Sequence, residues 1–293
     1  MKLSSGEKAF RASAFVILGV TALVMLVPFY NVVLISLSNP AAVAAQSVYL
    51  IPTVLDFSAY QTALSGTYIG NAFVVSLGVL FLGTSLNLAL TLSAGYVLAK
   101  RHLPGVRFLT LAILFTMLFS GGLIPFYLTV RGLGLVDNLL VMIIPSALDT
   151  FLLIIAINYF KTIPASMEES AKIDGATDFQ IMVRVIFPVA KPIVATLLLF
   201  YAVQRWNEWW LAMLFINDVH REPLQYVVRQ LLITISSVIN NSAGSAMADQ
   251  LRNQSGDAVK MASVVISIVP VLCIYPFLTR YFNQGILLGS IKE

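Results

Sequence analysis

The sequence has few charged residues and a single cysteine. Charged side chains make up 11% of its 293 residues, whereas soluble domains average about 25%. Cys273 has no second cysteine to pair with, and the two histidines, His102 and His220, are isolated from each other. The motifs H-E-x-x-H, C-x-x-C, G-x-x-x-x-G-K-[ST] and G-x-S-x-G are all missing. We therefore expect no catalytic residue, no metal site and no cofactor bound to this chain.

Apolar residues dominate instead. They make up 58% of the chain, and the mean hydropathy is +0.87, more than a water-soluble core can use. Six stretches reach the roughly 20 apolar residues that a membrane-spanning helix needs. The composition therefore predicts an all-α membrane protein with spans at residues 12–37, 71–99, 108–130, 139–160, 193–216 and 261–282. The first apolar run is too long for a signal-peptide core, so we expect an uncleaved first span.

Proline and glycine lie inside several of these spans. Pro28 is expected to kink the first, and Pro145 lies inside the fourth. Gly121, Gly122 and Pro125 break the third near its outer end, which suits a gate or hinge and equally suits plain packing. Asn87 and Asn158 are further polar candidates for a substrate path, although helix–helix hydrogen bonds are the expected role of each.

Lysine and arginine are unevenly distributed between the loops. Only five lie in residues 38–70, 131–138 and 217–260, and Arg205 lies inside the fifth span. The termini and the remaining loops, including residues 161–192, hold the other twelve: Lys2, Lys8, Arg11, Lys100, Arg101, Arg107, Lys161, Lys172, Arg184, Lys191, Arg280 and Lys292. Positively charged loops mark the cytoplasmic side, which places both termini and residues 161–192 in the cytoplasm. The net charge of +4 thus reflects membrane topology rather than nucleic-acid binding.

The long outer segment at residues 217–260 has two parts. Leu224–Val238 has the apolar spacing of a helix, and the small polar residues after it predict a loop. Loops of this length usually carry function, although a plain connector remains the alternative.

A polar segment, Ile163–Pro192, separates the fourth and fifth spans. Pro164 suits a first helical position, and Glu168 and Glu169 suit the following turn. Gly175 is a typical C-terminal stop.

The pair Thr177 and Gln180 then predicts a capping box that opens a second helix, and Pro188 and Pro192 mark the start of the fifth span. We expect a helix, a glycine turn and a helix on the cytoplasmic surface. Asp174 lies at a helix C-terminus, where the dipole disfavours it, so a cap or a partner's basic group is expected.

The spacing in this segment resembles a known motif. Glu169-Ser170-Ala171, three residues, Gly175, nine residues and Val185-Ile186-Phe187-Pro188 are similar to the EAA loop of binding-protein-dependent ABC importer permeases. The run Phe119–Pro125 and the tail from Arg280 to Ser290 resemble the polysaccharide branch of the sugar permeases, to which the alginate importer belongs.

The resemblance implies a multi-pass permease of the bacterial cytoplasmic membrane that imports an oligo- or polysaccharide by alternating access. It forms one transmembrane domain over residues 1–293, with a core at 70–285, the coupling loop at 163–192 and a periplasmic loop at 217–260. Its implied partners are an ATPase dimer that binds ATP and Mg²⁺, a second and non-identical permease, and a substrate-binding protein. The residues implied in ATPase coupling are Glu168, Glu169, Ala171, Asp174, Gly175 and Pro188.

Polar and aromatic residues gather at 204–210, in the fifth span. Ionisable groups inside spans usually face a cavity, and aromatic rings stack on sugars, so we expect a substrate path here. The alternatives are an ion pair between Arg205 and Glu208 and an interfacial aromatic belt. The path residues are Arg205, Trp206, Asn207, Glu208 and Trp209.

Two other functions compete with the importer. A membrane-embedded enzyme that modifies lipid or polysaccharide would need clustered His, Asp or Glu at one membrane face, and the sequence has no such cluster. An ion-coupled secondary transporter should have several acidic residues within its spans, and Glu208 is the one such residue.

Overall fold

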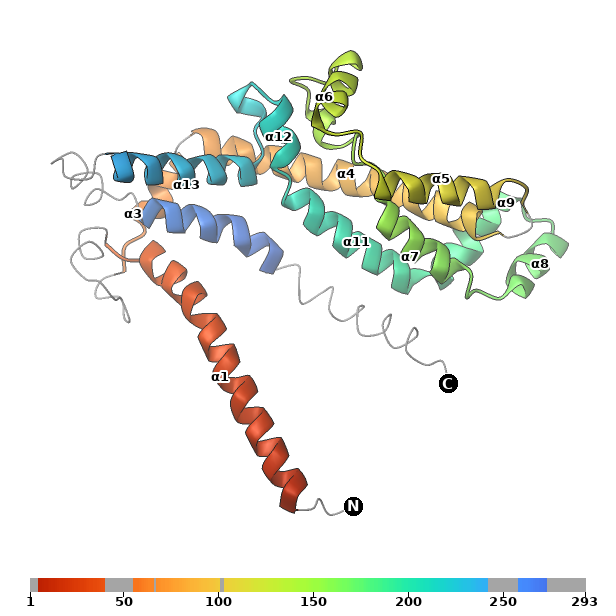
Figure 1. Ribbon diagram of the computed structural model, residues 1–293, viewed down its shortest axis with the longest axis horizontal. Helices are drawn as coiled ribbons and strands as arrows, with labels where there is room; N and C mark the ends of the chain where they lie inside the picture. Colours follow the sequence, from red (N-terminus) through yellow and green to blue (C-terminus); the bar gives the residue numbers. More distant parts are fainter. Residues whose placement is uncertain (1–4, 40–54, 66, 101–102, 242–257, 273–293) are drawn as a thin grey trace. The chain divides into compact units, whose positions relative to one another are not determined.

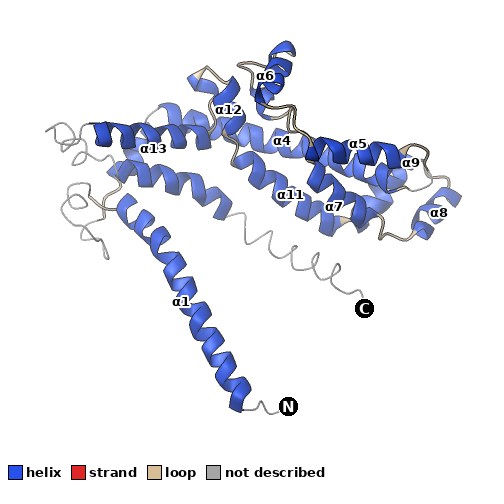
Figure 2. Cartoon of the chain, viewed as in Figure 1, coloured by secondary structure: helices blue, strands red, loops and turns tan. Residues whose placement is uncertain are grey.

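The chain is described by a computed structural model over residues 5–39, 55–65, 67–100, 103–241 and 258–272. Within these residues every regular element is a helix (Figure 2), and one isolated bridge joins Ser38 to Leu55. The helices form two compact units, Met1–Ile69 with Val228–Val269 and Gly70–Val227 with Pro270–Glu293. The prediction of a helical protein is confirmed for the described part of the chain.

The first unit contains the N-terminal helix, α1 (Ser5–Ser36), and α3 (Ser58–Ser65). The apolar side chains of α1 are exposed along most of its length, and Pro28 lies inside the helix without ending it. A helix that is apolar on all sides is typical of a membrane span. The hydroxyls of Ser36 and Tyr60 lie 2.7 Å apart, and Ala59 of α3 packs on Ala258 and Ala262 of the helix Ala258–Leu272.

The second unit is built along α4 (Thr67–Ala99) (Figure 1). The first half of α4 packs on a core from α6 (Leu123–Gly132), the 3₁₀ helix η1 (Leu139–Met142) and α12 (Trp210–Phe215). Its second half packs on α7 (Thr150–Phe160) and α11 (Lys191–Trp206), where the hydroxyls of Thr91 and Tyr201 lie 2.6 Å apart. α5 (Val106–Leu118) covers the same half.

The polar segment 163–192 forms several short helices at the end of α4. They are α8 (Ala165–Ile173), α9 (Asp178–Gln180), the π-helix η2 (Ile181–Ile186) and α10 (Phe187–Val189). The predicted helix–turn–helix is confirmed. Pro164 precedes α8 as its N-cap, one residue before the position predicted.

Three predicted spans are broken helices. α5 and α6 meet at 116°, which confirms the break expected at Gly121 and Gly122. The single helix expected at 139–160 is wrong over 139–149, because η1 ends at Met142 and α7 starts only at Thr150. The single helix expected at 193–216 is also wrong, because α11 ends at Trp206. Side-chain hydrogen bonds described below replace the missing helical bonds at both breaks.

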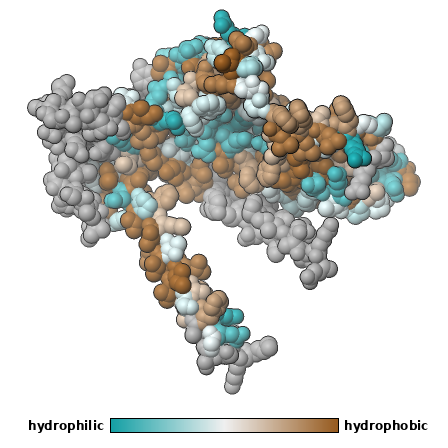
Figure 3. Space-filling view, viewed as in Figure 1, coloured by the Kyte–Doolittle hydropathy of each residue, from teal (hydrophilic) through white to brown (hydrophobic). Residues whose placement is uncertain are grey.

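The remaining predicted elements fall partly outside the described residues. The outer helix expected at Leu224–Val238 is confirmed as α13 (Leu224–Asn241), whereas the loop after it and the C-terminal tail lie beyond the described ranges. By length and composition, two described helices are suited to cross a membrane, or up to five if each bent pair counts as one span. Figure 3 shows hydrophobic side chains over α1 and α5, and more polar ones toward α8 and α9.

Candidate functional site

The turn after α8 is set by glycine. Gly175 has a φ of +80°, a left-handed conformation that a side chain disfavours. Its N–H donates to the Lys172 carbonyl at 3.0 Å, and the Ala176 N–H donates to the Ala171 carbonyl at 3.0 Å. No heavy atom lies within 4 Å of a Cβ added at Gly175. The glycine is therefore required by backbone conformation and not by crowding.

The capping box predicted after the turn is present. The Gln180 N–H donates to Thr177 Oγ1 at 3.4 Å, and the Thr177 N–H donates to Gln180 Oε1 at 2.9 Å. Buried Ile181 and Ile186 then anchor η2 in the core under α8. The outward-facing surface of the helix–turn–helix is thus held on a rigid base.

Apolar and charged side chains share that outward surface. Ile173 is 87% exposed and Phe179 is 70% exposed. Glu169 and Asp174 are also exposed. We call the exposed residues Glu169, Ile173, Asp174 and Phe179 the coupling surface, after the coupling role that the resemblance to the EAA loop predicts for this segment.

Two other predicted coupling residues face the chain itself. Glu168 Oε2 lies 3.2 Å from Lys100 Nζ, at the end of α4, and Ala171 packs against the core next to η2. Pro188 stands in the first turn of α10 and is exposed. Sequence reasoning overlooked Lys100, which it counted only as a topology signal.

Arg205 fills the break between η1 and α7. It is 2% exposed, and its guanidinium donates to the Met142 carbonyl at 2.6 Å and to Ser146 Oγ at 2.7 Å. It also donates to Asn87 Oδ1 at 2.9 Å and to the carbonyls of Ile143 and Ser146. These bonds satisfy carbonyls that the interrupted helix leaves without partners.

A glycine of α4 makes room for this guanidinium. A Cβ added at Gly83 would stand 2.8 Å from Arg205 Cδ and 2.9 Å from Arg205 Nε. Asn87, one turn later, joins the same network through its amide, which also donates to the Ser146 carbonyl at 3.3 Å. The helix–helix hydrogen bond predicted for Asn87 is confirmed.

The second break, after α11, carries the other predicted path residues. Trp206 is 3% exposed and its ring stands edge-on to Phe73, whereas Asn207 is exposed. Glu208 Oε1 accepts the Leu211 N–H at 2.9 Å and so caps α12. Trp209 is half-buried, next to Trp210. None of the described ion pairs joins Arg205 to Glu208.

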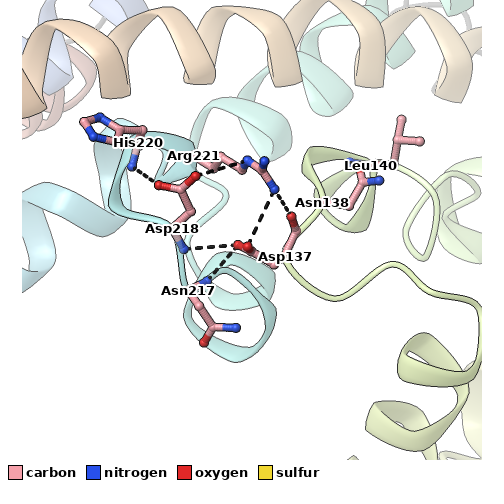
Figure 4. A network of polar contacts seen from close by, with 7 residues as sticks. All are labelled: Asp137, Asn138, Leu140, Asn217, Asp218, His220 and Arg221. Carbon is pink, nitrogen blue, oxygen red and sulfur yellow. Dashed lines mark hydrogen bonds and ion pairs between the residues drawn. The ribbon is translucent and has the colours of Figure 1, made fainter.

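Two loops are joined at the other end of α4 (Figure 4). Asp137, with a φ of +55°, accepts the N–H groups of Asn217 and Asp218 at 3.1 Å each on Oδ1. Arg221 donates to the Asp137 carbonyl and lies 3.4 Å from Asp218 Oδ2. The backbone N–H groups of Asp218 and Asn217 hold the pKa of Asp137 below its ordinary value of 3.8. Sequence reasoning missed this network, although D-N and N-D pairs are typical turn signals.

The loop network and the coupling surface lie at opposite ends of α4, a helix long and apolar enough to cross a membrane. Asn71, in the first turns of α4, donates to the His220 carbonyl, while Lys100 directly follows its last turn. Asn71 and Lys100 are 29 residues apart, which corresponds to about 44 Å along a helix that rises 1.5 Å per residue. This length exceeds the roughly 30 Å of a bilayer core. Among the described residues no three His, Cys, Asp or Glu side chains form a metal-binding group.

A helical bundle with broken helices, a polar helix–turn–helix at one end and joined loops at the other is the arrangement expected of a membrane permease. No protein-family model matches the chain. Protein LplC of Bacillus subtilis is 38% identical over 292 residues, covering 100% of this chain and 98% of that protein. The polygalacturonan/rhamnogalacturonan transport system permease protein YtcP of the same species is 38% identical over 271 residues, covering 92% and 94%.

A solved structure is also similar. It is the crystal structure of a bacterial ABC transporter involved in the import of the acidic polysaccharide alginate, with a TM-score of 0.87, 34% identity, and coverage of 96% of this chain and 99% of that one. The chain belongs to the family of permease subunits of sugar and polysaccharide ABC transporters. Such permeases are not enzymes, because a separate ATPase subunit hydrolyses ATP, and a substrate-binding protein is a further partner.

Proposed function

We propose that this chain is one of two non-identical permeases that carry a polysaccharide or oligosaccharide across the bacterial cytoplasmic membrane. The similarity to the alginate importer over nearly the full length of both chains carries this proposal. Acidic polysaccharides such as alginate are the first candidate substrates. A relative named for polygalacturonan and rhamnogalacturonan transport supports the same class.

The proposed topology has six spans, both termini in the cytoplasm and a single transmembrane domain at residues 1–293. Its core covers 70–285, with the coupling loop at 163–192 inside and the loop at 217–260 outside. The 44 Å estimated above between the two ends of α4 supports opposite sides for these two loops. The excess of Lys and Arg at the α8 end supports the cytoplasm for that end.

ATP and Mg²⁺ bind the partner ATPase, which docks on the coupling surface. Ile173 and Phe179 supply its apolar centre, Glu169 and Asp174 its charged rim, and Gly175 fixes the angle between α8 and α9. Closure of the ATPase pair displaces this element, and the spans rock between outward-open and inward-open states. The substrate arrives from a binding protein at the outer loops.

Substrate contacts are proposed at the break between α11 and α12. Breaks in spanning helices expose backbone and polar groups at membrane depth, where transporters bind their substrates. Asn207, Glu208 and Trp209 are at least partly exposed there and supply the contacts, whereas Arg205 and Trp206 are buried. Gly121, Gly122 and Pro125 form the proposed hinge between α5 and α6.

The test is reconstitution of the chain with its ATPase, second permease and binding protein in liposomes. We expect substrate-stimulated ATP hydrolysis and uptake in the wild type. Ile173→Asp and Phe179→Asp should insert normally but lose roughly 10-fold or more of that stimulation, because a charge at an interface centre disrupts docking. Gly175→Pro and Glu169→Lys should also uncouple hydrolysis from uptake.

The control is Thr162→Asp, which adds a charge in the same cytoplasmic segment outside the coupling surface. It should behave as the wild type. Normal substrate-stimulated ATP hydrolysis in both the Ile173 and Phe179 variants would contradict docking of the ATPase on the coupling surface. Uptake by the chain without an ATPase would contradict the proposed function.

A further inference from the structure

A lysine at the end of α4 contacts both arms of the helix–turn–helix. Lys100 Nζ lies 3.2 Å from Glu168 Oε2 on α8 and 3.8 Å from Asp178 Oδ1 on α9. Since Lys100 directly follows the last residue of α4, one ammonium group joins a spanning helix to the two helices that flank Gly175.

The ammonium group is sheltered and oriented. The Lys100 side chain is 12% exposed and that of Glu168 is 23% exposed, so solvent screens this pair less than a surface pair. Lys100 Nζ also stands 4.2 Å from the centre of the Tyr96 ring, a cation–π contact one turn earlier in α4. The Tyr96 ring in turn stands edge-on to Phe160 of α7.

The charge of Lys100 is stable in this setting. Burial by itself lowers the pKa of Lys100, but the contacts with Tyr96 and Glu168 outweigh it and raise the pKa above the ordinary lysine value. The group therefore stays protonated at physiological pH, and both carboxylates keep their cation.

Packing near this lysine is open. A cavity of about 220 Å³ lies beside it, lined by residues that include Tyr96, Phe160, Lys161 and Ile163. α8 is therefore not in close contact with the ends of α4 and α7 on this side, and the Lys100–Glu168 pair bridges the space. The other pair across the two arms, Lys172 with Asp178 at 3.6 Å, is 50% and 74% exposed and is correspondingly weaker.

We propose that Lys100 is a positioning residue for energy coupling, which holds α8 and α9 at a fixed angle and transmits their displacement to α4. The inference rests on the proposed function, because coupling has meaning only if an ATPase docks on α8 and α9. Contact to both arms, through the sheltered pair with Glu168 and the longer pair with exposed Asp178, makes α4 move with the element, whereas a contact to one arm would let the turn at Gly175 bend instead.

The experiment measures the number of substrate molecules imported per ATP hydrolysed by the full transporter in liposomes. Lys100→Gln removes the charge and shortens the side chain by one atom, and should lower this ratio by roughly 2- to 30-fold. Lys100→Arg keeps the charge and should retain most of the ratio. Two controls are Lys172→Gln, which loses only the exposed pair, and Lys161→Gln, which lines the same cavity but takes part in none of the described ion pairs.

Exchanging the charges of Lys100 and Glu168 tests the same contact through its acidic partner. Glu168→Lys alone should lower the ratio, because it places two cations together. Adding Lys100→Glu and Asp178→Asn restores an opposite-charge pair to α8 without a new repulsion but leaves α9 without an ion pair, and should recover the ratio only in part. If Lys100→Gln fails to assemble, recovery of assembly in the exchanged variant supports the proposal, and failure to recover overturns it.

Two other results would overturn the inference while leaving the proposed function intact. One is an unchanged ratio in Lys100→Gln with wild-type uptake. The other is a fall of uptake and hydrolysis by the same factor, which means fewer active transporters and no loss of coupling. A wild-type chain without ATP-dependent uptake would instead contradict the proposed function itself.

Discussion

The guanidinium of Arg205 donates five hydrogen bonds, all to neutral oxygens. A cation buried in a membrane span is costly unless dipoles compensate it. Here the compensation comes from the carbonyls of Met142, Ile143 and Ser146 and from the side-chain oxygens of Asn87 and Ser146. Arg205 thus stabilises a break in the backbone, a role that its residue type and its position in a span do not reveal.

Gly83 offers a sharp test of this arrangement. Its added Cβ would clash with Arg205 Cδ at 2.8 Å, and the five hydrogen bonds prevent the side chain from moving aside. We expect Gly83→Ala to lower the free energy of unfolding by about 1–3 kcal/mol, the usual cost of overpacking. Unfolding in detergent by a graded denaturant measures the change.

Gly78→Ala, in the same helix, is the matched control. No heavy atom lies within 4 Å of a Cβ at Gly78, and alanine favours a helix over glycine by roughly 1 kcal/mol. The control should therefore be neutral or stabilising. Equal effects of the two substitutions would show that Arg205 is free to move.

At the scale of elements, the helix–turn–helix at 163–192 follows from local rules. The capping box and the positive φ at Gly175 involve residues at most a few positions apart, so the sequence was sufficient to predict them. The break between α11 and α12 was not predicted, because residues 193–216 are apolar enough for one continuous helix. Its stability depends on Glu208 and on packing against α4 and η1.

Two substitutions of Glu208 distinguish a structural role of this residue from a substrate-binding role. Glu208→Ala removes the acceptor for the Leu211 N–H and should cost about 1 kcal/mol of stability, as lost helix caps do. Glu208→Gln keeps a carbonyl acceptor, so its loss of stability should be only a few tenths of the loss in Glu208→Ala. The unfolding midpoint and the uptake rate are measured for both variants.

The comparison of the two readouts decides the role. If Glu208 serves only as a cap, Gln restores both stability and uptake. If its charge also contacts the substrate, Gln restores stability but not uptake, which is the outcome expected from the proposed path. A Gln variant as unstable as the Ala variant would contradict the cap.

At the scale of the whole molecule, the topology can be tested by accessibility. The single native cysteine, Cys273, is first replaced by Ser. A cysteine placed at Ile173 should then react with a membrane-impermeant thiol reagent only in inside-out vesicles. A cysteine at His220 should react only in right-side-out vesicles, because these residues lie near opposite ends of α4.

Asp174 provides the control for the first position, since it is exposed on the same turn and should be labelled from the same side. Labelling of the two ends from one side would contradict the six-span arrangement with both termini in the cytoplasm.

Local sequence patterns were enough to predict the membrane class, the extent of the first two spans, the helix–turn–helix and the family, because hydropathy, caps and motif spacing depend on neighbouring residues. The breaks in the fourth and fifth spans and the contacts of Arg205, Glu168 and Lys100 became visible only in the folded structure. Arg205 and Asn87 are 118 positions apart, and Arg205 and Met142 are 63 apart. Such contacts form only when distant helices pack together, so no local pattern could specify them.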